Sequence, residues 1–226
     1  MADISFLESV SLFSELQDSD LKKIGNVLAP KTIIKNSIVL IEDEAGSTMF
    51  IIKKGSVKIT RITEDGREVI LSILNEGDFF GEMSILDDAP RSANAVTLED
   101  SILLVIHKKD FFQMLHDYPQ ITINLLKELA HRLRRGDSQI KSLSLQDAIS
   151  KVASTLLRIA DDSGTIFKGQ VTISKLPPQQ DLANMAGTSR ETISRAIGTL
   201  TKLGYLKKEG GNLLILDYDK FLSDFS

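Results

Sequence analysis

The chain has 226 residues, of which 42% are hydrophobic and 26% charged, and it contains no cysteine. This composition is ordinary for a globular protein of one large domain or two smaller ones. Without cysteine there can be no disulfide framework, no thiolate zinc site and no cysteine nucleophile. The sequence opens Met1-Ala2-Asp3 without a signal-peptide pattern, and its longest apolar run, Ile102–Ile106, is far shorter than the roughly 20 residues that cross a bilayer. We therefore expect a soluble, cytoplasmic protein with no membrane partner.

The formal net charge of −4 is unevenly distributed along the chain. Residues 1–117 hold 12 Lys and Arg against 20 Asp and Glu, a balance of −8, whereas residues 118–226 hold 15 against 11, a balance of +4. Such a split suggests an acidic module joined to one that meets a polyanion. Ordinary solvated surface charge explains the same split equally well. The charge distribution alone therefore does not distinguish a polyanion-binding module from an ordinary charged surface, and a motif is needed to do so.

The first part of the chain changes from a helical to a strand-like pattern. Apolar residues at helical spacing within 6–24 predict one or two short helices. From about Lys31 to His107 the pattern is that of strands, and residues 56–74 alternate around a turn at Glu64–Arg67, which predicts a hairpin. Glycines recur nine to eleven residues apart, at Gly46, Gly55, Gly66 and Gly77. Short strands at that spacing indicate a β-barrel or jelly roll.

From Tyr118-Pro119 onward the spacing of apolar residues becomes helical. A heptad seam, with residues alternately four and three apart, is predicted at Leu129, Leu133, Gly136, Ile140 and Leu143. So narrow a stripe favours a parallel, coiled-coil-like contact with a second copy of the chain, although the helix could instead lie on its own domain. A second amphipathic helix is predicted over 147–160 and a break at 161–164.

The segment 177–200 has the signals of two short helices joined by a tight turn. Pro177-Pro178 precedes the first helix, Gly187 supplies the turn, and Ser189 is the N-cap of the second helix. The inward-facing residues are expected to be Leu182, Ala183, Ala186, Ile193, Ile197 and Leu200. This is the pattern of a helix-turn-helix.

The second of these helices has side chains suited to reading DNA. Opposite its apolar face stand Arg190, Glu191, Ser194 and Arg195. Arginine can donate two bonds to guanine O6 and N7, and a carboxylate can accept one from cytosine N4. Residues 203–206, a turn at 209–212 and residues 213–216 predict a hairpin wing. A major-groove-binding winged helix is favoured over a three-helix bundle with an ordinary charged face.

A second group of functional residues lies among the predicted strands. Gly81 allows a backbone N–H to approach an anion closely, while Arg91 and Ser92 are donors for a phosphate. Glu82 does not suit a pure anion site, but a carboxylate there can accept hydrogen bonds from ribose hydroxyls. The residues therefore suggest a nucleotide site, although taken alone they also fit a turn and a surface ion pair.

Both groups resemble motifs of one known family. Residues 80–86 (Phe-Gly-Glu-Met-Ser-Ile-Leu) and 90–93 (Pro-Arg-Ser-Ala) resemble the phosphate-binding cassette of cyclic-nucleotide-binding domains. Residues 188–195 (Thr-Ser-Arg-Glu-Thr-Ile-Ser-Arg) resemble the recognition helix of the cyclic AMP receptor protein and fumarate-nitrate regulator (CRP/FNR) family of bacterial transcription regulators. The resemblance covers nearly the whole chain, in the family's order.

The resemblance implies an α+β fold in three parts. These are an N-terminal cyclic-nucleotide-binding β-roll or jelly roll with N-terminal helices (1–117), a long dimerisation helix (118–146) and a C-terminal winged helix-turn-helix (147–226). It implies a regulator rather than an enzyme: a homodimer that binds a pseudo-palindromic operator in double-stranded DNA, contacts RNA polymerase and needs no metal. Its effector would be a cyclic nucleotide, with cyclic AMP expected first.

The resemblance also assigns roles to individual residues. Glu82 would accept from the ribose 2′-hydroxyl, Arg91 and Ser92 would grip the cyclic phosphate, and Arg132 would lie near the ligand. The full nucleotide set is Gly81, Glu82, Met83, Arg91, Ser92, Arg132, Gly136 and Asp137. The DNA set is Gln179, Ser189, Arg190, Glu191, Thr192 and Arg195, with Arg190, Glu191 and Arg195 on the bases and Ser189 and Thr192 on phosphates.

One pair of residues departs from the family's pattern. Where cyclic AMP responders commonly place Thr-Ser against the adenine, this chain has Gly136-Asp137. A carboxylate only accepts, so Asp137 could meet the adenine 6-amino group or, more fully, the N1–H and 2-amino donors of guanine. It could equally be a solvated helix charge. Alternatives are therefore a guanine nucleotide, cyclic GMP or cyclic di-GMP, and regulation without a ligand.

Two interpretations come from other classes of protein. A cupin-like metalloenzyme also has a β-roll, but it needs clustered ligands, and His107, His116 and His131 are widely spaced. A nucleotide-binding module attached to an effector that does not bind DNA would fit the first half of the chain. It would leave the arginine-bearing helix 190–195 unexplained.

Overall fold

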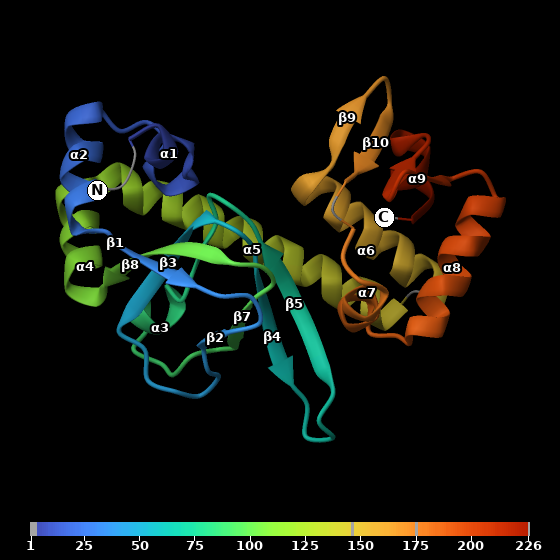
Figure 1. The fold of residues 1–226 in the computed structure, drawn as a ribbon, viewed down its shortest axis with the longest axis horizontal. Helices are drawn as coiled ribbons and strands as arrows, with labels where there is room; N and C mark the ends of the chain where they lie inside the picture. The colour runs from blue at the N-terminus through green and yellow to red at the C-terminus, as the bar shows by residue number, and fades with distance from the viewer. Residues whose placement is uncertain (1–3, 146, 175, 226) are drawn as a thin grey trace. The chain divides into compact units, whose positions relative to one another are not determined.

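The computed structural model describes residues 4–145, 147–174 and 176–225, with the backbone alone at 138 and 141–145. The chain forms two compact units, Met1–Arg134 and Arg135–Ser226. Figure 1 labels the elements of both units. Within the described ranges no helix has the length and apolar character that a membrane span requires. The functional division into 1–117, 118–146 and 147–226 stays a prediction.

The first unit is built on a β-roll of two four-stranded antiparallel sheets. Their strand orders are β1-β8-β3-β6 and β2-β7-β4-β5. The strands are β1 (Ala29–Ile33), β2 (Ile38–Leu40), β3 (Thr48–Lys54), β4 (Val57–Ile62), β5 (Glu68–Leu74), β6 (Phe79–Phe80), β7 (Asn94–Thr97) and β8 (Ser101–His107). This confirms the predicted β-roll.

The predicted hairpin is β4–β5, whose register runs from Val57 opposite Leu74 to Ile62 opposite Glu68. Gly66 closes its turn with φ +79°, a left-handed conformation that glycine adopts without steric cost. Between β6 and β7 the short helix α3 (Met83–Leu86) interrupts the strands. The sequence pattern did not separate this helix from its neighbours, because four residues are too few to show a helical period.

Helices cover one side of the roll. They are α1 (Ile4–Ser9), the 3₁₀ helix η1 (Ser11–Phe13), α2 (Asp18–Val27), α4 (Lys108–Asp117) and the first half of α5 (Pro119–Leu145). Their apolar faces share one core with β3 and β8, which includes Leu7, Phe13, Leu21, Met49, Ile106, Phe111 and Ile121. A smaller cluster lies between the sheets and consists of Phe50, Ile52, Val57, Phe80, Ala95 and Leu103. The cassette segment 80–86 thus begins in strand β6, whose Phe79 and Phe80 are buried in these two clusters.

The apolar residues of α5 divide between two faces, and the contact of the predicted seam with a second copy stays a prediction. Ile121 and Leu125 are buried, and Leu129, one turn further on, packs against the same core. Leu133 and Ile140 are 68% and 65% exposed. Leu129 is therefore half-buried against its own domain. A Cβ added at Gly136 would meet no atom within 4 Å, and the side chain of Leu143 is outside those described.

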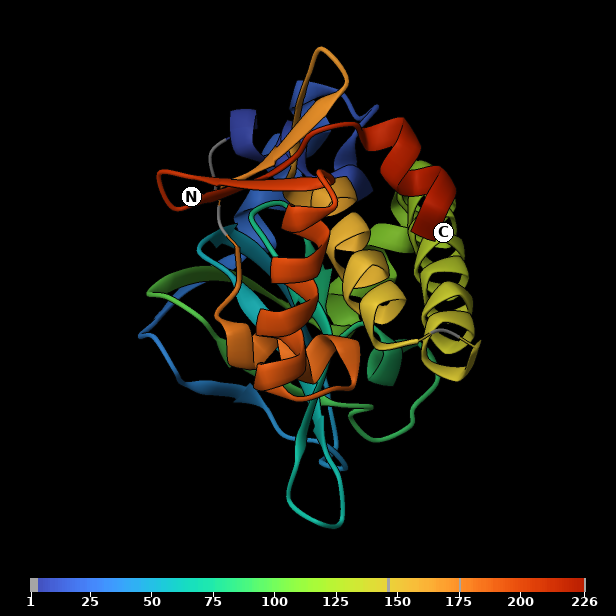
Figure 2. The ribbon, with the colours of Figure 1, turned by 90° about the vertical axis from the view of Figure 1, so that its right-hand side faces the viewer.

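The second unit contains three packed helices, a sheet and a terminal helix. α6 (Ala148–Ser163), α7 (Gln179–Ala186) and α8 (Arg190–Lys202) pack against one another (Figures 1 and 2). Asp147 caps α6 by accepting from the backbone N–H of Ser150. The helix continues past the expected break at 161 and ends before Gly164, whose N–H donates to Ala160 O at 2.8 Å. α9 (Tyr218–Phe225) closes the unit.

The predicted wing is confirmed as β11 (Leu206–Glu209) and β12 (Asn212–Ile215). It belongs to a four-stranded sheet of order β11-β12-β10-β9, in which β9 (Thr165–Phe167) and β10 (Gln170–Ile173) form a second hairpin. This hairpin was not predicted from the sequence. Its loop is Lys168-Gly169, where both residues have positive φ, as a type I′ turn requires, and Gly169 is the one sequence signal for it.

Candidate functional site

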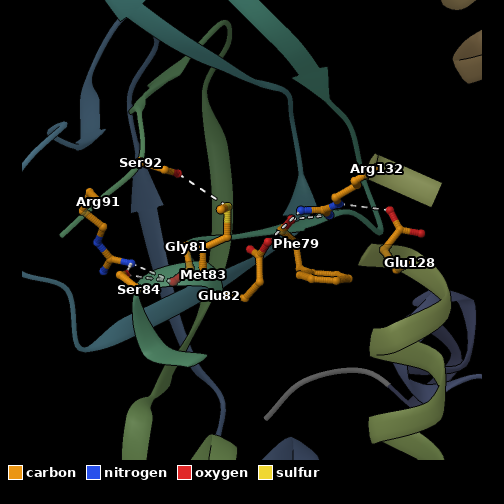
Figure 3. Close-up of polar contacts among 9 residues, drawn as sticks. All are labelled: Phe79, Gly81, Glu82, Met83, Ser84, Arg91, Ser92, Glu128 and Arg132. Atoms are coloured by element: carbon orange, nitrogen blue, oxygen red, sulfur yellow. Dashed lines mark hydrogen bonds and ion pairs between the residues drawn. The ribbon is translucent and has the colours of Figure 1, made fainter. Parts of the chain in front are cut away.

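Arg91 lies inside the β-roll, where its side chain is only 5% exposed. Its Nη1 donates to Gly81 O and to Ser84 Oγ, both at 2.7 Å, and its Nη2 donates to Thr48 O at 2.7 Å (Figure 3). Desolvation lowers the pKa of the Arg91 guanidinium, and the Glu82 carboxylate acts in the opposite direction. The predicted phosphate-binding cation is thus held by neutral acceptors of its own chain.

Two glycines make room for this guanidinium. A Cβ at Gly46 would lie 2.3 Å from Cζ and Nε of Arg91, and a Cβ at Gly81 would lie 2.9 Å from Nη1. The main chain of Arg91 is held as well, since its N–H donates to Glu44 O at 2.8 Å and its carbonyl accepts from Asp43 N–H at 2.9 Å. The loop before β3 therefore fixes the position from which the side chain enters the roll.

Glu82 is also buried, at 3% exposure, and it meets a side chain from the long helix. Arg132 Nη1 lies 3.1 Å from Glu82 Oε1, and Arg132 Nη2 donates to Phe79 O at 2.8 Å. Arg132 Nε donates to Glu128 Oε1 at 3.1 Å, and the guanidinium stacks 4.4 Å from the centroid of the Phe79 ring (Figure 3). The structure thus brings together two predicted ligand residues, Glu82 and Arg132.

The remaining cassette residues face elsewhere. Ser92 is exposed, and its Oγ lies 3.5 Å from Sδ of Met83. Figure 3 shows the Arg91 guanidinium beside Gly81 and Ser84, whereas the Ser92 hydroxyl points toward Met83. The two predicted phosphate donors therefore do not share one surface. A phosphate could meet both only if the Arg91 side chain left its internal acceptors.

Gly136 and Asp137 lie on the part of α5 that belongs to the second unit. Gly136 is four residues beyond Arg132 and shares its helix face. Asp137 is five residues beyond Arg132 and so lies about 140° around the helix axis from it. Along α5, therefore, Gly136 rather than Asp137 continues the face that carries Arg132.

Burial makes the Glu82 carboxyl a source of pH dependence. Desolvation raises its pKa above the ordinary value of 4.5, and Arg132 only partly opposes this. The folded state therefore binds the Glu82 proton more tightly than the unfolded state, so its contribution is greatest below pH 4.5 and is lost as pH rises through the raised pKa. We expect Glu82→Gln to abolish this fall in stability, as measured by urea unfolding at a series of pH values.

Glu76→Gln is the matched control for that measurement, because Glu76 is an exposed carboxylate in the turn between β5 and β6. This variant should keep the pH dependence of the wild type. Unfolding curves for Glu82→Gln that follow the wild type at every pH would show that Glu82 does not titrate as proposed.

In the second unit the helix-turn-helix forms as predicted. Gly187 has φ 59° and ψ 42°, and its N–H donates to Ala183 O, which ends α7. Ser189 caps α8, its Oγ accepting from Thr192 N–H at 3.2 Å. Ile193, Ile197 and Leu200 are buried, as expected from their spacing. Two local signals, one glycine and one serine, therefore set the angle at which α8 leaves the turn.

The opposite face of α8 is exposed at Arg190, Glu191, Ser194 and Arg195. Thr192 is half-buried, and its Oγ1 accepts from Arg195 Nη2 at 3.4 Å. The backbone N–H of Glu191 and the Ser189 hydroxyl keep the pKa of the Glu191 carboxyl below its usual value, and Arg190 and Arg195 add to this effect. This face therefore offers two cations and one ionised carboxylate. Gln179, the first residue of α7, is half-buried.

Four residues that hold the cassette together were given no role from the sequence, namely Gly46, Thr48, Ser84 and Glu128. The one local signal is Glu128, which stands four residues before Arg132, a spacing at which a carboxylate and an arginine meet on one helix face. Thr48 gives no such signal, because it is 43 residues from Arg91 in the sequence. Among the residues whose placement is described, no three His, Asp or Glu side chains gather in a way that would hold a metal ion.

Comparison with known families matches both halves of the chain. A model of the cyclic nucleotide-binding domain matches residues 30–118, and a model of the Crp-like helix-turn-helix domain matches residues 150–223. The first model spans the β-roll with its cassette, and the second spans α7, α8 and the wing. The matched segments therefore contain the two groups of residues described above, apart from those on α5.

Relatives resemble the chain over nearly its whole length. The CRP-like cAMP-activated global transcriptional regulator of Mycobacterium tuberculosis is 32% identical over 214 residues, which are 95% of this chain and 96% of that protein. The cyclic AMP receptor protein of Thermus thermophilus is 33% identical over 176 residues, 77% of this chain and 78% of that protein. The solved structure of FixK2 from Bradyrhizobium japonicum shares the fold, with a TM-score of 0.74 at 21% identity over 87% of this chain and 96% of that one.

Proposed function

The chain belongs to the CRP/FNR family of transcription regulators, and from this premise we propose that it is a homodimer whose DNA binding is controlled by cyclic AMP held in the β-roll. The chain is a DNA-binding regulator with a cyclic-nucleotide-binding domain, and its relatives are regulators rather than enzymes. The proposal adds the effector, the dimer and a pseudo-palindromic site in double-stranded DNA. Contact with RNA polymerase and a cytoplasmic location stay predictions.

The observation that carries the proposal is the contact between the cassette and α5. Glu82 belongs to the segment between β6 and α3, and Arg132, which lies 3.1 Å from it, belongs to the long helix. A ribose hydroxyl that donates to Glu82 would compete with Arg132 for the same carboxylate. Occupation of the roll would therefore change what holds α5, and α5 leads directly to the second unit.

The cyclic phosphate would take Ser92 and the backbone around Gly81 as its first donors. Arg91 would join them by exchanging neutral acceptors for a charged one, to which its guanidinium can donate two parallel hydrogen bonds. That exchange gives a physical difference between the free and the bound roll. A ligand can shift the protein between two states only by its difference in affinity for those states. The difference in nucleotide affinity between the two states therefore limits how far the nucleotide can change DNA binding.

The proposal is tested by calorimetric titration with cyclic AMP, cyclic GMP and cyclic di-GMP in parallel. We expect cyclic AMP to bind, and we expect operator DNA to tighten its binding by the factor by which cyclic AMP tightens DNA binding, since the coupling is reciprocal. Ser92→Ala should weaken nucleotide binding, whereas Ser47→Ala, in the loop before β3, should not. DNA affinity that ignores saturating cyclic AMP would contradict the proposal.

A guanine nucleotide is the second candidate effector, and one observation favours it. Asp137 offers only acceptors, which suits the paired N1–H and 2-amino donors of guanine better than the single amino group of adenine. Selective binding of cyclic GMP or cyclic di-GMP in the same titration would assign the regulator to that class.

The DNA-reading helix gives a separate prediction. Arg190→Ala and Arg195→Ala should each cost about 1–3 kcal/mol on the cognate site and relax the preference at one base pair. Thr192→Ala should weaken binding to all sequences about equally, because phosphate contacts position the protein and base contacts specify the sequence. Affinities for a set of single-base operator variants, measured by fluorescence anisotropy, check both statements. An unchanged ranking of the variants in Arg190→Ala would remove that residue from the base-reading set.

A further inference from the structure

The cassette presents one sulfur atom to solvent. The chain has five methionines and no cysteine, so its only sulfur atoms are those of methionine thioethers. Met83, the first residue of α3, is 49% exposed. The other methionines that the structure describes are buried, with exposures of 0%, 5% and 6% at Met49, Met114 and Met185. Among the described methionines, Met83 is therefore the one that a dissolved reagent can reach.

Met83 lies beside a predicted phosphate donor. Ser92 Oγ is 3.5 Å from Met83 Sδ, and the hydroxyl points toward the sulfur (Figure 3). Both side chains are exposed, whereas the guanidinium of Arg91, the residue before Ser92, is turned into the roll. A thioether is a weak hydrogen-bond acceptor, so the Ser92 hydroxyl can still turn toward a ligand.

We propose that Met83 is an oxidation site through which peroxides weaken nucleotide binding to the β-roll. The inference rests on the proposed function, because it takes the nucleotide phosphate as the group that Ser92 holds. It adds a second chemical input, an oxidant, to a site whose first input is the nucleotide.

The reaction transfers one oxygen atom. A lone pair of the thioether sulfur attacks one oxygen of hydrogen peroxide, the O–O bond breaks, and a sulfur–oxygen bond forms. After proton transfer between the two oxygens, the products are methionine sulfoxide and water. The sulfur loses two electrons and the peroxide gains them, so the reaction balances without another reactant.

The product opposes phosphate binding in two ways. The sulfoxide group is polar, and its oxygen is a stronger acceptor than the thioether sulfur. Bound to Sδ of Met83, this oxygen can reach the Ser92 hydroxyl, which then donates to the sulfoxide instead of to a phosphate. The oxygen also places partial negative charge beside the position of an anion. Neither effect involves the contacts of Arg91 inside the roll.

The first measurement follows the modification itself, without any nucleotide. The full chain is treated with hydrogen peroxide in its folded state, and sulfoxide is quantified in tryptic peptides. Cleavage after lysine and arginine places each of the five methionines in a different peptide. We expect Met83 to be oxidised at least about tenfold faster than Met49, Met114 and Met185, because it is more exposed. Equal rates at these four residues would refute the assignment of the site.

The second measurement is the affinity for cyclic AMP, cyclic GMP and cyclic di-GMP, determined by calorimetry before and after treatment. Oxidation should weaken binding about tenfold, the effect of losing one hydrogen bond to a charged group. Methionine sulfoxide reductase should restore the affinity, since it returns the sulfoxide to the thioether. Peroxide should not change the affinity of Met83→Leu from that of its own untreated form. Met185→Leu is the matched control, and it should respond as the wild type does because it keeps Met83.

Ser92→Ala tests the route from the sulfur to the ligand. Without the hydroxyl, oxidation can act only through the partial charge of the sulfoxide. It should therefore weaken binding by a smaller factor than in the wild type. The same factor in both proteins would contradict the part assigned to Ser92.

The outcomes separate this inference from the proposed function. An untreated protein that binds none of the three nucleotides would overturn the proposed function, and the regulatory role of Met83 with it. Selective oxidation of Met83 in such a protein would still support the reactive site. If the untreated protein binds a nucleotide and keeps the same affinity after full oxidation of Met83, the proposed function stands and this inference is wrong.

Discussion

Arg91→Ala is expected to lower the free energy of unfolding of the β-roll by about 3 kcal/mol, because removing one partner of a buried hydrogen-bonded charge leaves the others unsatisfied. Gly81 O, Ser84 Oγ and Thr48 O would all lose a donor in a buried region. Urea unfolding measures the effect. Arg67→Ala is the matched control, because the side chain of Arg67 is 80% exposed and its loss should change stability by less than about 0.5 kcal/mol.

The same variant should lose nucleotide binding, because it strips a cation from a phosphate that still has to be desolvated. Its DNA affinity without nucleotide should stay at the wild-type level when measured below the unfolding transition. Arg91→Lys separates the two roles of this residue. Lysine keeps the positive charge but lacks the planar set of N–H donors of arginine. Relative to Arg91→Ala, this variant should therefore recover part of the affinity for the phosphate and little of the free energy of unfolding. Wild-type nucleotide affinity in a folded Arg91→Ala protein would exclude Arg91 from the ligand site.

Gly46→Ala should have the second largest effect, a loss of about 1–3 kcal/mol in the free energy of unfolding, typical of overpacking a filled interior. The new Cβ would lie 2.3 Å from Cζ and Nε of Arg91 and 2.5 Å from Ser84 Oγ, so the guanidinium has to move. Gly198→Ala is the matched control, and it is expected to raise the free energy of unfolding rather than lower it. A Cβ at Gly198 on α8 meets no atom within 4 Å, and alanine is the better helix former by up to about 1 kcal/mol.

A double-mutant cycle shows whether the clash with Arg91 is the cause. If it is, Gly46→Ala should be less destabilising in the Arg91→Ala background, because two of the three nearest atoms that the Cβ would strike belong to Arg91, and the third, Ser84 Oγ, is then free to move. If the two changes in the free energy of unfolding simply add, the clash with Arg91 is not the cause. The destabilisation by Gly46→Ala then comes from elsewhere in the loop. The cycle therefore tests the geometry of the cassette without any ligand.

The sequence by itself was sufficient wherever a feature depends on neighbours within a few residues. Gly187 and Ser189 specify the turn and the cap of α8 through their own backbone conformation and side-chain reach. Pro119 marks the start of α5 because its fixed φ suits the first turn of a helix. The β4–β5 hairpin follows from alternation around a turn, and the exposed arginines of α8 follow from helical periodicity. Of the two family motifs, residues 188–195 lie in such a locally determined segment.

Only the tertiary structure decided where side chains point when their partners are distant in the chain. Arg91 turns into the roll because Thr48 and Gly81 offer acceptors there and Gly46 leaves space, and none of these is adjacent to it in sequence. Leu129 and Leu133 are equivalent as spacing, but the core formed by the N-terminal helices takes one and leaves the other exposed. Heptad spacing in the sequence predicts which residues of a helix share a face. Packing against the rest of the domain determines which face of the helix stays exposed for a partner.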